Sequence, residues 1–326
     1  MGETKTRINK FDNLKGLAIL LIVLGHMTMF RGNDFIGFIR NFVFIIHLPV
    51  FFFVAGYFSK IGPDEPIKAF KRLFVPFIVF CLLWELFNVY FLGNPPKEVL
   101  FLHPGYMLWF LMCLFFMKMA LPIMDRFKYP LTISIIGALL IGFVDSNILG
   151  ISRTFAFMPL FILGFYYEDY KSKFVEKVSI VENNKFAICI LILAIVASVI
   201  IALNVPYGVI CKKHAYGNNW MWDMLLRGII LLVSTIDVLV LTRFMTNDKI
   251  MITKWGINSF TVYLFHPYVI KLTKMFAKPY LKGHMKMTIL FIFVMAFLIT
   301  YVLSRDFFTK ALNKFLNLIY KALCIE

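Results

Sequence analysis

The sequence predicts an all-α membrane protein: one membrane-embedded domain over residues 1–326, built as a polytopic bundle of about ten transmembrane helices. Hydrophobic residues make up 60% of the chain and charged residues only 16%, whereas soluble domains hold about 45–50% and about 25%. The hydrophobic residues fall in long runs, with short clusters of Lys and Arg between them. This distribution is typical of charge beside membrane spans, so the net charge of +16 does not indicate binding of nucleic acid.

Individual spans follow from the length of these runs, since a helix needs about 20 residues to cross the hydrocarbon core. Turn-forming stretches such as "IGPDEP" and "GNPPKE" separate the runs. The first run has no small-residue cleavage site after it, so we expect it to be retained as a signal anchor. In chain order the predicted spans, of which the sixth and ninth are short, are 13–30, 36–58, 73–92, 105–123, 131–149, 154–168, 186–204, 222–244, 256–271 and 287–305.

The distribution of Lys and Arg predicts the orientation of the bundle. With the N-terminus inside, 22 of the 34 Lys and Arg lie in inside segments and 12 lie outside. Because positive charge marks the cytoplasmic side, both termini are expected in the cytoplasm, and the protein is expected as a multi-pass protein of a bacterial or archaeal plasma membrane. Residues 271–286, with five lysines, run against this rule, so they form either an acceptor-facing surface or part of a misread ninth span. The longest polar connections are 169–185, 205–221 and 272–286.

The same orientation brings ionisable and amphipathic residues from six spans to one depth. Lys15 lies at the cytoplasmic rim, and His26 lies 11 residues later, about 16 Å further along the helix axis. That depth is at or just beyond the middle of a hydrocarbon core about 30 Å thick. Such residues usually face the bundle interior or a wet cavity and are candidates for function. The other residues predicted in the outer half, or at its entrance, are His47, Glu85, Trp109, Arg153 and His266.

Each of these residues also has a structural alternative. His47 could bond a carbonyl freed by the proline that follows it, and His266 could end a helix at its own proline. Glu85 could only pair with Arg153 or a histidine, and Trp109 could belong to the interfacial aromatic belt. His26 has no proline or glycine after it that would free a carbonyl, so a functional role is favoured there.

A second polar set lies at the inner face and suits an anionic cytosolic ligand. Lys71 and Arg72 could instead only determine topology. The members of this set are Asp12, Lys15, Lys71 and Arg72.

No metal and no permanently bound cofactor is expected. The five cysteines are scattered without a short-spaced pair, which supports neither a disulfide framework nor a zinc site. No dinucleotide-binding motif or P-loop appears.

Several motifs resemble those of one family. "DNLKGLAILLIVLGH", with Lys15, ten residues and then His26, is followed by "IIHLPVFFFVAGYF". Further matches, in the family's order, are "KRLFVPF" (71–77), "LWFL" (108–111), "RTFAFMPLFILGFYY" (153–167) and "INSFTVYLFHPY" (257–268). Over nearly its whole length the chain resembles the acyltransferase 3 family of integral-membrane O-acyltransferases, and its fucose 4-O-acetylase-like branch in particular.

The resemblance implies ten membrane helices and transfer of an acyl group, usually acetyl from the co-substrate acetyl-CoA, to a hydroxyl of a sugar or cell-surface glycan, which can be lipid-linked. The family histidine maps to His26, as general base or as an acetyl-histidine nucleophile. The family's basic residue maps to Lys15, where many relatives have an arginine, whose bidentate fork a lysine lacks.

We therefore expect His26 to be catalytic, the inner-face set to bind the donor, and the outer residues to bind the acceptor or the oxyanion. Two other classes remain open. Intramembrane His and Glu also serve proton relays in transporters, although the halves of this chain show no convincing repeat. A non-catalytic membrane scaffold would leave His26 unexplained.

Overall fold

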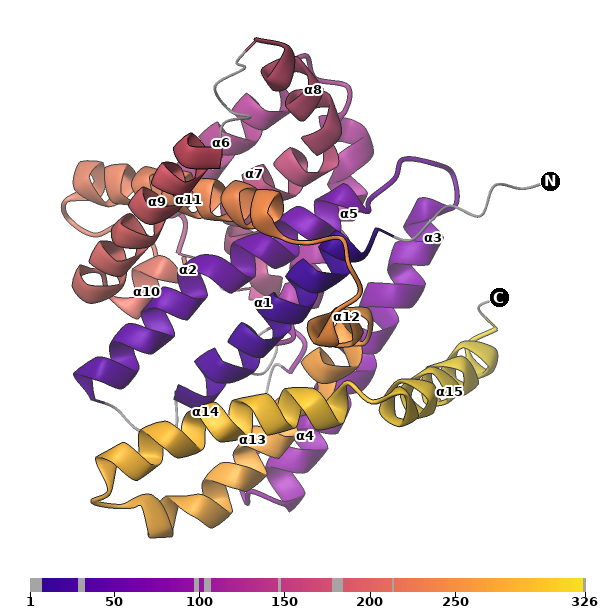
Figure 1. Ribbon diagram of the computed structural model, residues 1–326. Helices are drawn as coiled ribbons and strands as arrows, with labels where there is room; N and C mark the ends of the chain where they lie inside the picture. Colours follow the sequence, from indigo (N-terminus) through magenta and orange to yellow (C-terminus); the bar gives the residue numbers. More distant parts are fainter. Residues whose placement is uncertain are drawn as a thin grey trace.

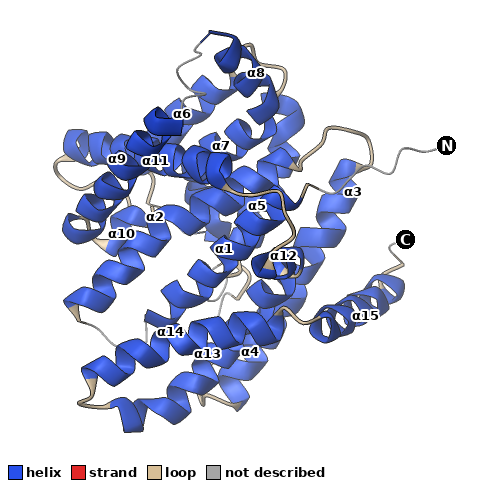
Figure 2. Ribbon diagram, in the orientation of Figure 1, coloured by secondary structure: helices blue, strands red, loops and turns tan. Residues whose placement is uncertain are grey.

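The computed structural model describes residues 8–28, 33–96, 100–102, 107–145, 148–177, 184–212 and 214–324. Throughout these ranges the regular secondary structure is helical and no strand occurs, as Figure 2 shows. A π-helical turn over Phe70–Phe74 joins α3 to α4, and 3-10 turns cover Ile141–Phe143 and Ile148–Gly150. The helices are α1 (Asn9–Met27), α2 (Asp34–Tyr57), α3 (Glu65–Ala69), α4 (Val75–Tyr90), α5 (Trp109–Met124), α6 (Pro130–Leu140), α7 (Ile151–Phe165), α8 (Tyr167–Lys177), α9 (Asn184–Asn204), α10 (Tyr207–Ile210), α11 (Trp220–Phe244), α12 (Met251–Ile257), α13 (Ser259–Leu281), α14 (Met285–Leu303) and α15 (Asp306–Ala322).

The helices confirm a helical membrane bundle. Each of the ten predicted spans overlaps at least one helix, and the sixth and ninth each overlap two. Residues 29–30, 105–106 and 146–147 of the first, fourth and fifth spans lie outside the described residues. The number of ten crossings and the cytoplasmic position of both termini stay predictions. Among the residues that the structure describes, six helical segments are long and apolar enough to cross a membrane, namely Asp34–Tyr57, Glu65–Tyr90, Ile148–Phe165, Asn184–Asn204, Trp220–Phe244 and Met285–Leu303.

Three segments predicted as polar connections are partly helical. The predicted ninth span ends at residue 271, but α13 continues to Leu281, so most of 272–286 is helix and not a connection. The lysines there interrupt the hydropathy but not the helix, because Ile270 and Leu281 still pack inward. α8 occupies the start of 169–185, and α10 lies within 205–221.

The last helix, α15, lies beyond every predicted span, at the edge of the bundle (Figure 1). Its Leu312 and Leu316 are buried, whereas Phe307 and Leu318 are exposed. Hydropathy alone misses this helix because its apolar residues form a stripe and not a continuous run.

Glycines bring α1 and α12 into backbone contact, which fixes the helix that carries Lys15. A Cβ at Gly16 would lie 2.0 Å from the Ile252 carbonyl oxygen, and one at Gly256 would lie 1.7 Å from that of Asp12. Only residues without a Cβ permit this crossing.

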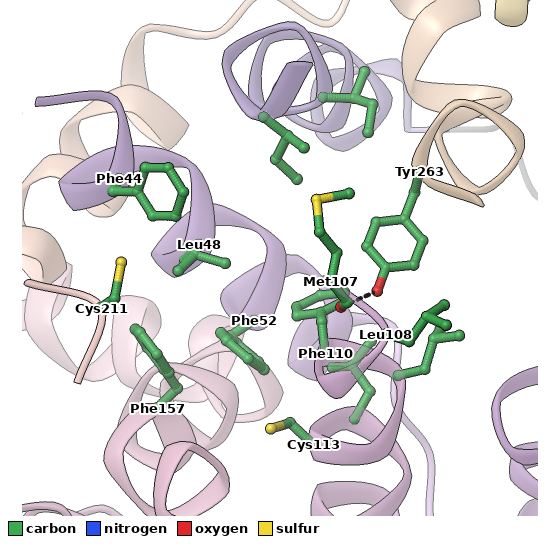
Figure 3. Close-up of a cluster of buried hydrophobic side chains, with 14 of the residues drawn as sticks. Phe44, Leu48, Phe52, Met107, Leu108, Phe110, Cys113, Phe157, Cys211 and Tyr263 are labelled. Atoms are coloured by element: carbon green, nitrogen blue, oxygen red, sulfur yellow. Dashed lines mark hydrogen bonds between the residues drawn. The ribbon is translucent and has the colours of Figure 1, made fainter. Parts of the chain in front are cut away.

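Aromatic side chains fill the core between α2, α5, α7 and α13. The Phe52 ring stacks on Phe157 with centroids 4.8 Å apart, and it lies 4.8 Å from the ring of Phe110. Tyr263 of α13 closes this layer by donating a hydrogen bond of 2.6 Å to the Met107 carbonyl, as Figure 3 shows.

Candidate functional site

A cavity of about 310 Å³ lies between α1, α2, α3, α5, α13 and the π-helical turn; we call it the Lys15 cavity. Four cationic side chains line it, whereas Glu65, which pairs with Lys68 at 3.0 Å, is the one acidic lining residue among those described. The end of the cavity away from Lys15 is apolar, with Ile22 and Tyr263 in its wall. The four cations are Lys15, Lys68, Arg72 and Lys118.

Lys15 enters this cavity from α1 and is held by Asp12. The Lys15 Nζ lies 2.8 Å from an Asp12 carboxylate oxygen and 5.7 Å from the centroid of the Phe58 ring. Asp12 is only 3% exposed and is not among the lining residues of the cavity. Its position therefore suits holding Lys15 better than contacting an anionic ligand, which a carboxylate would repel.

The π-helical turn separates Lys71 from Arg72. Arg72 lines the cavity, whereas Lys71 turns toward α15, where its Nζ lies 5.7 Å from the Tyr320 ring centroid. The Tyr320 hydroxyl also donates a hydrogen bond of 2.8 Å to the Lys71 carbonyl. Such π-helical turns are frequent at functional sites because they redirect neighbouring side chains.

Sequence reasoning missed two of the four cations. Lys68 precedes Arg72 by four residues, one helical turn. This spacing predicts that the two side chains lie on the same face of a helix. Lys118 is one of the 22 Lys and Arg counted in the inside segments, but it also lines the cavity, and its Nζ donates a hydrogen bond of 2.9 Å to the Ser59 hydroxyl.

Three histidines from three helices gather beyond the apolar end of the Lys15 cavity. His26 of α1 and His266 of α13 have ring centroids 5.6 Å apart. Phe44 of α2 lies 5.7 Å from the His26 ring and 4.5 Å from the His47 ring. Since Ile22 lines the cavity, its apolar end lies one helical turn, about 6 Å, short of His26.

Two of these histidines have a fixed tautomer. The Nδ1 of His47 lies 2.7 Å from the Val43 carbonyl, and that of His266 lies 2.8 Å from the Val262 carbonyl. Because a carbonyl only accepts, each Nδ1 carries the proton and each Nε2 holds a lone pair. The Nε2 of His266 is buried and has no hydrogen-bond partner among the described residues.

The two proline-based alternatives for these histidines do not hold. Pro49 removes the donor to the Ile45 carbonyl, but the Ser234 hydroxyl bonds that carbonyl, not His47. α13 runs through Pro267 to Leu281, so His266 does not end a helix.

His26 lies in the last turn of α1, which ends at Met27, and not in the middle of a longer helix. It is 8% exposed. The partial negative charge at a helix C-terminus stabilises a cation there by about 0.3–1 kcal/mol. A base that becomes positive when it takes up a proton benefits from this position.

Trp109 and Arg153 form a cation–π pair. The Arg153 guanidinium carbon lies 4.3 Å from the Trp109 ring centroid, so this arginine stacks on Trp109 and does not pair with Glu85. Glu85 follows Trp84, whose ring packs against Tyr268 of α13 with centroids 5.1 Å apart. Glu85 therefore lies on α4, next to the residue that contacts α13.

The chemistry available here is that of imidazole, hydroxyl and cationic groups. Over the described ranges, no group of three or more His, Cys, Asp and Glu side chains has the geometry to hold a metal ion. In this site, the cavity lined by cations ends next to the three histidines, and the Nε2 atoms of His47 and His266 hold lone pairs.

Comparison with known proteins gives one match. The family model described as an acyltransferase domain, that of the acyltransferase 3 family, matches residues 8–305. No curated protein and no solved structure matches the chain.

Proposed function

The chain belongs to the acyltransferase 3 family and is a membrane acyltransferase, and from this premise we propose that it moves an acetyl group from acetyl-CoA to a hydroxyl of a sugar or glycan, with His26 as general base. Acetyl-CoA enters the Lys15 cavity from the cytosol, and the acceptor approaches from the opposite side of the bilayer. We also propose the fucose 4-O-acetylase-like branch, from the motifs, and a plasma-membrane location in a bacterium or archaeon.

The observation that carries this proposal is the Lys15 cavity itself. Its cations suit the phosphates of coenzyme A, since Arg and Lys make charge-assisted hydrogen bonds to phosphate. Its apolar end at Ile22 and Tyr263 suits the uncharged pantetheine arm and stops one turn short of His26.

In the reaction, a ring nitrogen of His26 takes the proton from the acceptor hydroxyl, and the oxygen attacks the thioester carbonyl carbon. The new C–O bond forms, the C–S bond breaks, and the coenzyme A thiolate receives the proton from His26. The products are the O-acetyl acceptor and coenzyme A with a free thiol. His47 and His266, whose Nδ1 atoms are occupied by carbonyls, can accept hydrogen bonds from acceptor hydroxyls at Nε2.

The test uses the purified protein, labelled acetyl-CoA and a glycan extract of the native membrane. His26→Gln should lower the transfer rate by about 10²–10⁴-fold, the usual contribution of a general base, while acetyl-CoA still binds. His284→Gln, at an exposed histidine before α14, is the matched control and should transfer at the wild-type rate. Wild-type transfer by His26→Gln would refute the role of His26.

A donor-side variant separates binding from chemistry. Lys15→Met should weaken acetyl-CoA binding, measured by calorimetry, and should have a smaller effect on the transfer rate at saturating donor. An unchanged affinity for acetyl-CoA would show that Lys15 does not bind the donor. Solute movement without any acetylation would instead support the transporter alternative, which family membership does not favour.

A further inference from the structure

Three further cations are not among the residues that line the Lys15 cavity. They are Arg40 of α2, Arg153 of α7 and Lys212, which follows α10. Each lies over an aromatic ring: the guanidinium carbons of Arg40 and Arg153 lie 4.5 Å from Tyr207 and 4.3 Å from Trp109, and the Lys212 Nζ lies 5.0 Å from Phe157. Sequence reasoning had singled out only Arg153 among the three.

The three cations converge on one region. Arg40 and Arg153 both interact electrostatically with Tyr207, although they come from different helices. Lys212 lies over Phe157, one turn after Arg153 on the same face of α7. Figure 3 shows Cys211, the neighbour of Lys212, between Phe157 and Phe44.

The described residues provide no counter-charge for this cluster. Neither arginine nor Lys212 belongs to any of the observed ion pairs. The Nε atoms of Arg40 and Arg153 are buried without a hydrogen-bond partner in the described ranges. Lys212 is only 4% exposed, and burial, followed by the nearby Arg227 charge, lowers the pKa of its amine to about 7.

Burying the unpaired Lys212 amine is costly, and so is burying the Nε donors of Arg40 and Arg153 without an acceptor. A bound anion would satisfy both kinds of group. Paired guanidinium groups suit carboxylate and phosphate in particular, because each offers a planar fork of donors.

This cluster lies beside the reacting groups. The Tyr207 ring is 4.9 Å from Phe44, whose ring contacts both His26 and His47. Arg40 precedes His47 by seven residues on α2, about 10 Å along the helix axis. An anion bound at Arg40 would therefore be held one or two sugar rings away from a hydroxyl at the histidines.

We propose that the acetyl acceptor is anionic, with a carboxylate or phosphate bound by Arg40, Arg153 and Lys212 while its hydroxyl meets His26. This inference rests on the proposed function, since it names the class of acceptor for the same site. Uronic acid-containing glycans and sugars linked to a lipid phosphate share this chemistry. The aromatic rings beneath the cations offer stacking surfaces for the sugar rings.

The first experiment identifies the charge of the product. Purified protein is incubated with labelled acetyl-CoA and a glycan and glycolipid extract of the native membrane, and the His26-dependent label is separated by anion exchange at pH 7. The label should be retained and released by salt. Loss of retention after carbodiimide capping identifies a carboxylate, and loss after mild acid hydrolysis identifies a phosphate-linked sugar.

Label in the neutral flow-through would overturn the anionic acceptor while leaving acetyl transfer intact. Absence of any His26-dependent label would overturn the proposed function, and the anionic acceptor with it.

The second experiment assigns the residues. Arg40→Gln and Arg153→Gln should each raise the KM for the acceptor extract by about 10–100-fold, as expected for the loss of a charge-assisted hydrogen bond. Acetyl-CoA affinity should stay unchanged, which also shows that the variants are folded. Arg40→Lys, which keeps the charge, should restore part of the loss.

The matched control is Arg305→Gln. Arg305 is an exposed arginine between α14 and α15, and it also stacks on an aromatic ring, since its guanidinium carbon lies 4.0 Å from the Tyr301 ring centroid. Its acceptor KM should equal that of the wild type. If Arg40→Gln and Arg153→Gln also leave the acceptor KM unchanged, this site does not bind the acceptor.

Discussion

The crossing of α1 and α12 predicts a large effect of one added methyl group. In Gly16→Ala the new Cβ would lie 2.0 Å from the Ile252 carbonyl oxygen, whereas ordinary van der Waals contact begins at 3.4 Å. The two helices must therefore separate by about 1.4 Å, and overpacking of this kind costs about 1–3 kcal/mol. Gly16 is next to Lys15, so the shift also moves the donor-binding end of α1.

Thermal unfolding in detergent, followed by tryptophan fluorescence, measures this cost. Gly16→Ala should lower the unfolding midpoint by roughly 2–10 °C and should weaken acetyl-CoA binding. Gly37→Ala is the matched control, because Gly37 is also helical but has nothing within 4 Å of an added Cβ. It should leave stability unchanged or raise it by up to about 1 kcal/mol, the gain from Gly to Ala in a helix. Equal midpoints for the two variants would refute the close crossing and the positioning of Lys15 that follows from it.

Three further predictions concern the donor and acceptor sites. Arg72→Gln should weaken acetyl-CoA binding by about 10-fold or more, whereas Lys71→Gln, whose side chain lies over Tyr320, should have little effect on the same calorimetric titration; equal losses would place both residues at the donor. Ile22→Trp should fill the apolar end of the Lys15 cavity and abolish transfer while free coenzyme A still binds, and transfer at the normal rate would show that the acetyl group takes another path. Because the pKa of Lys212 is lowered to about 7, its amine is charged below that pH and neutral above it, so acceptor affinity should fall as the pH rises from 6 to 8. Lys212→Met should flatten this pH dependence of the acceptor KM, and an unchanged profile would exclude Lys212.

The prediction of the helices succeeded where hydropathy is continuous. The long apolar runs near 36–58, 186–204 and 222–244 are each one helix with nearly the predicted bounds. It failed where a helix is amphipathic, as in α15 and the second half of α13, because a stripe of apolar residues leaves the average hydropathy low.

The candidate site was predicted in part for a similar reason. His26 and Lys15 were found because an ionisable residue in an apolar run is conspicuous and because their spacing matches a family motif. Lys118 and Lys212 were missed because lysines near the ends of spans look like topology signals. Arg40 was missed because nothing in its own segment indicates the ring of Tyr207, which is far away in sequence.

By itself, the sequence determined that this chain is a helical membrane protein of one enzyme family. Both properties depend on short continuous stretches of residues, namely apolar runs and family motifs. Only the tertiary structure decided which charged side chains share a cavity. A single π-helical turn sends Arg72 and Lys71 in different directions, and two helices and a short loop bring Arg40, Arg153 and Lys212 together. Such groupings depend on helix crossings set by contacts between residues distant in the chain, like that of Gly16 with Ile252, and a one-dimensional pattern of hydropathy carries no record of those contacts.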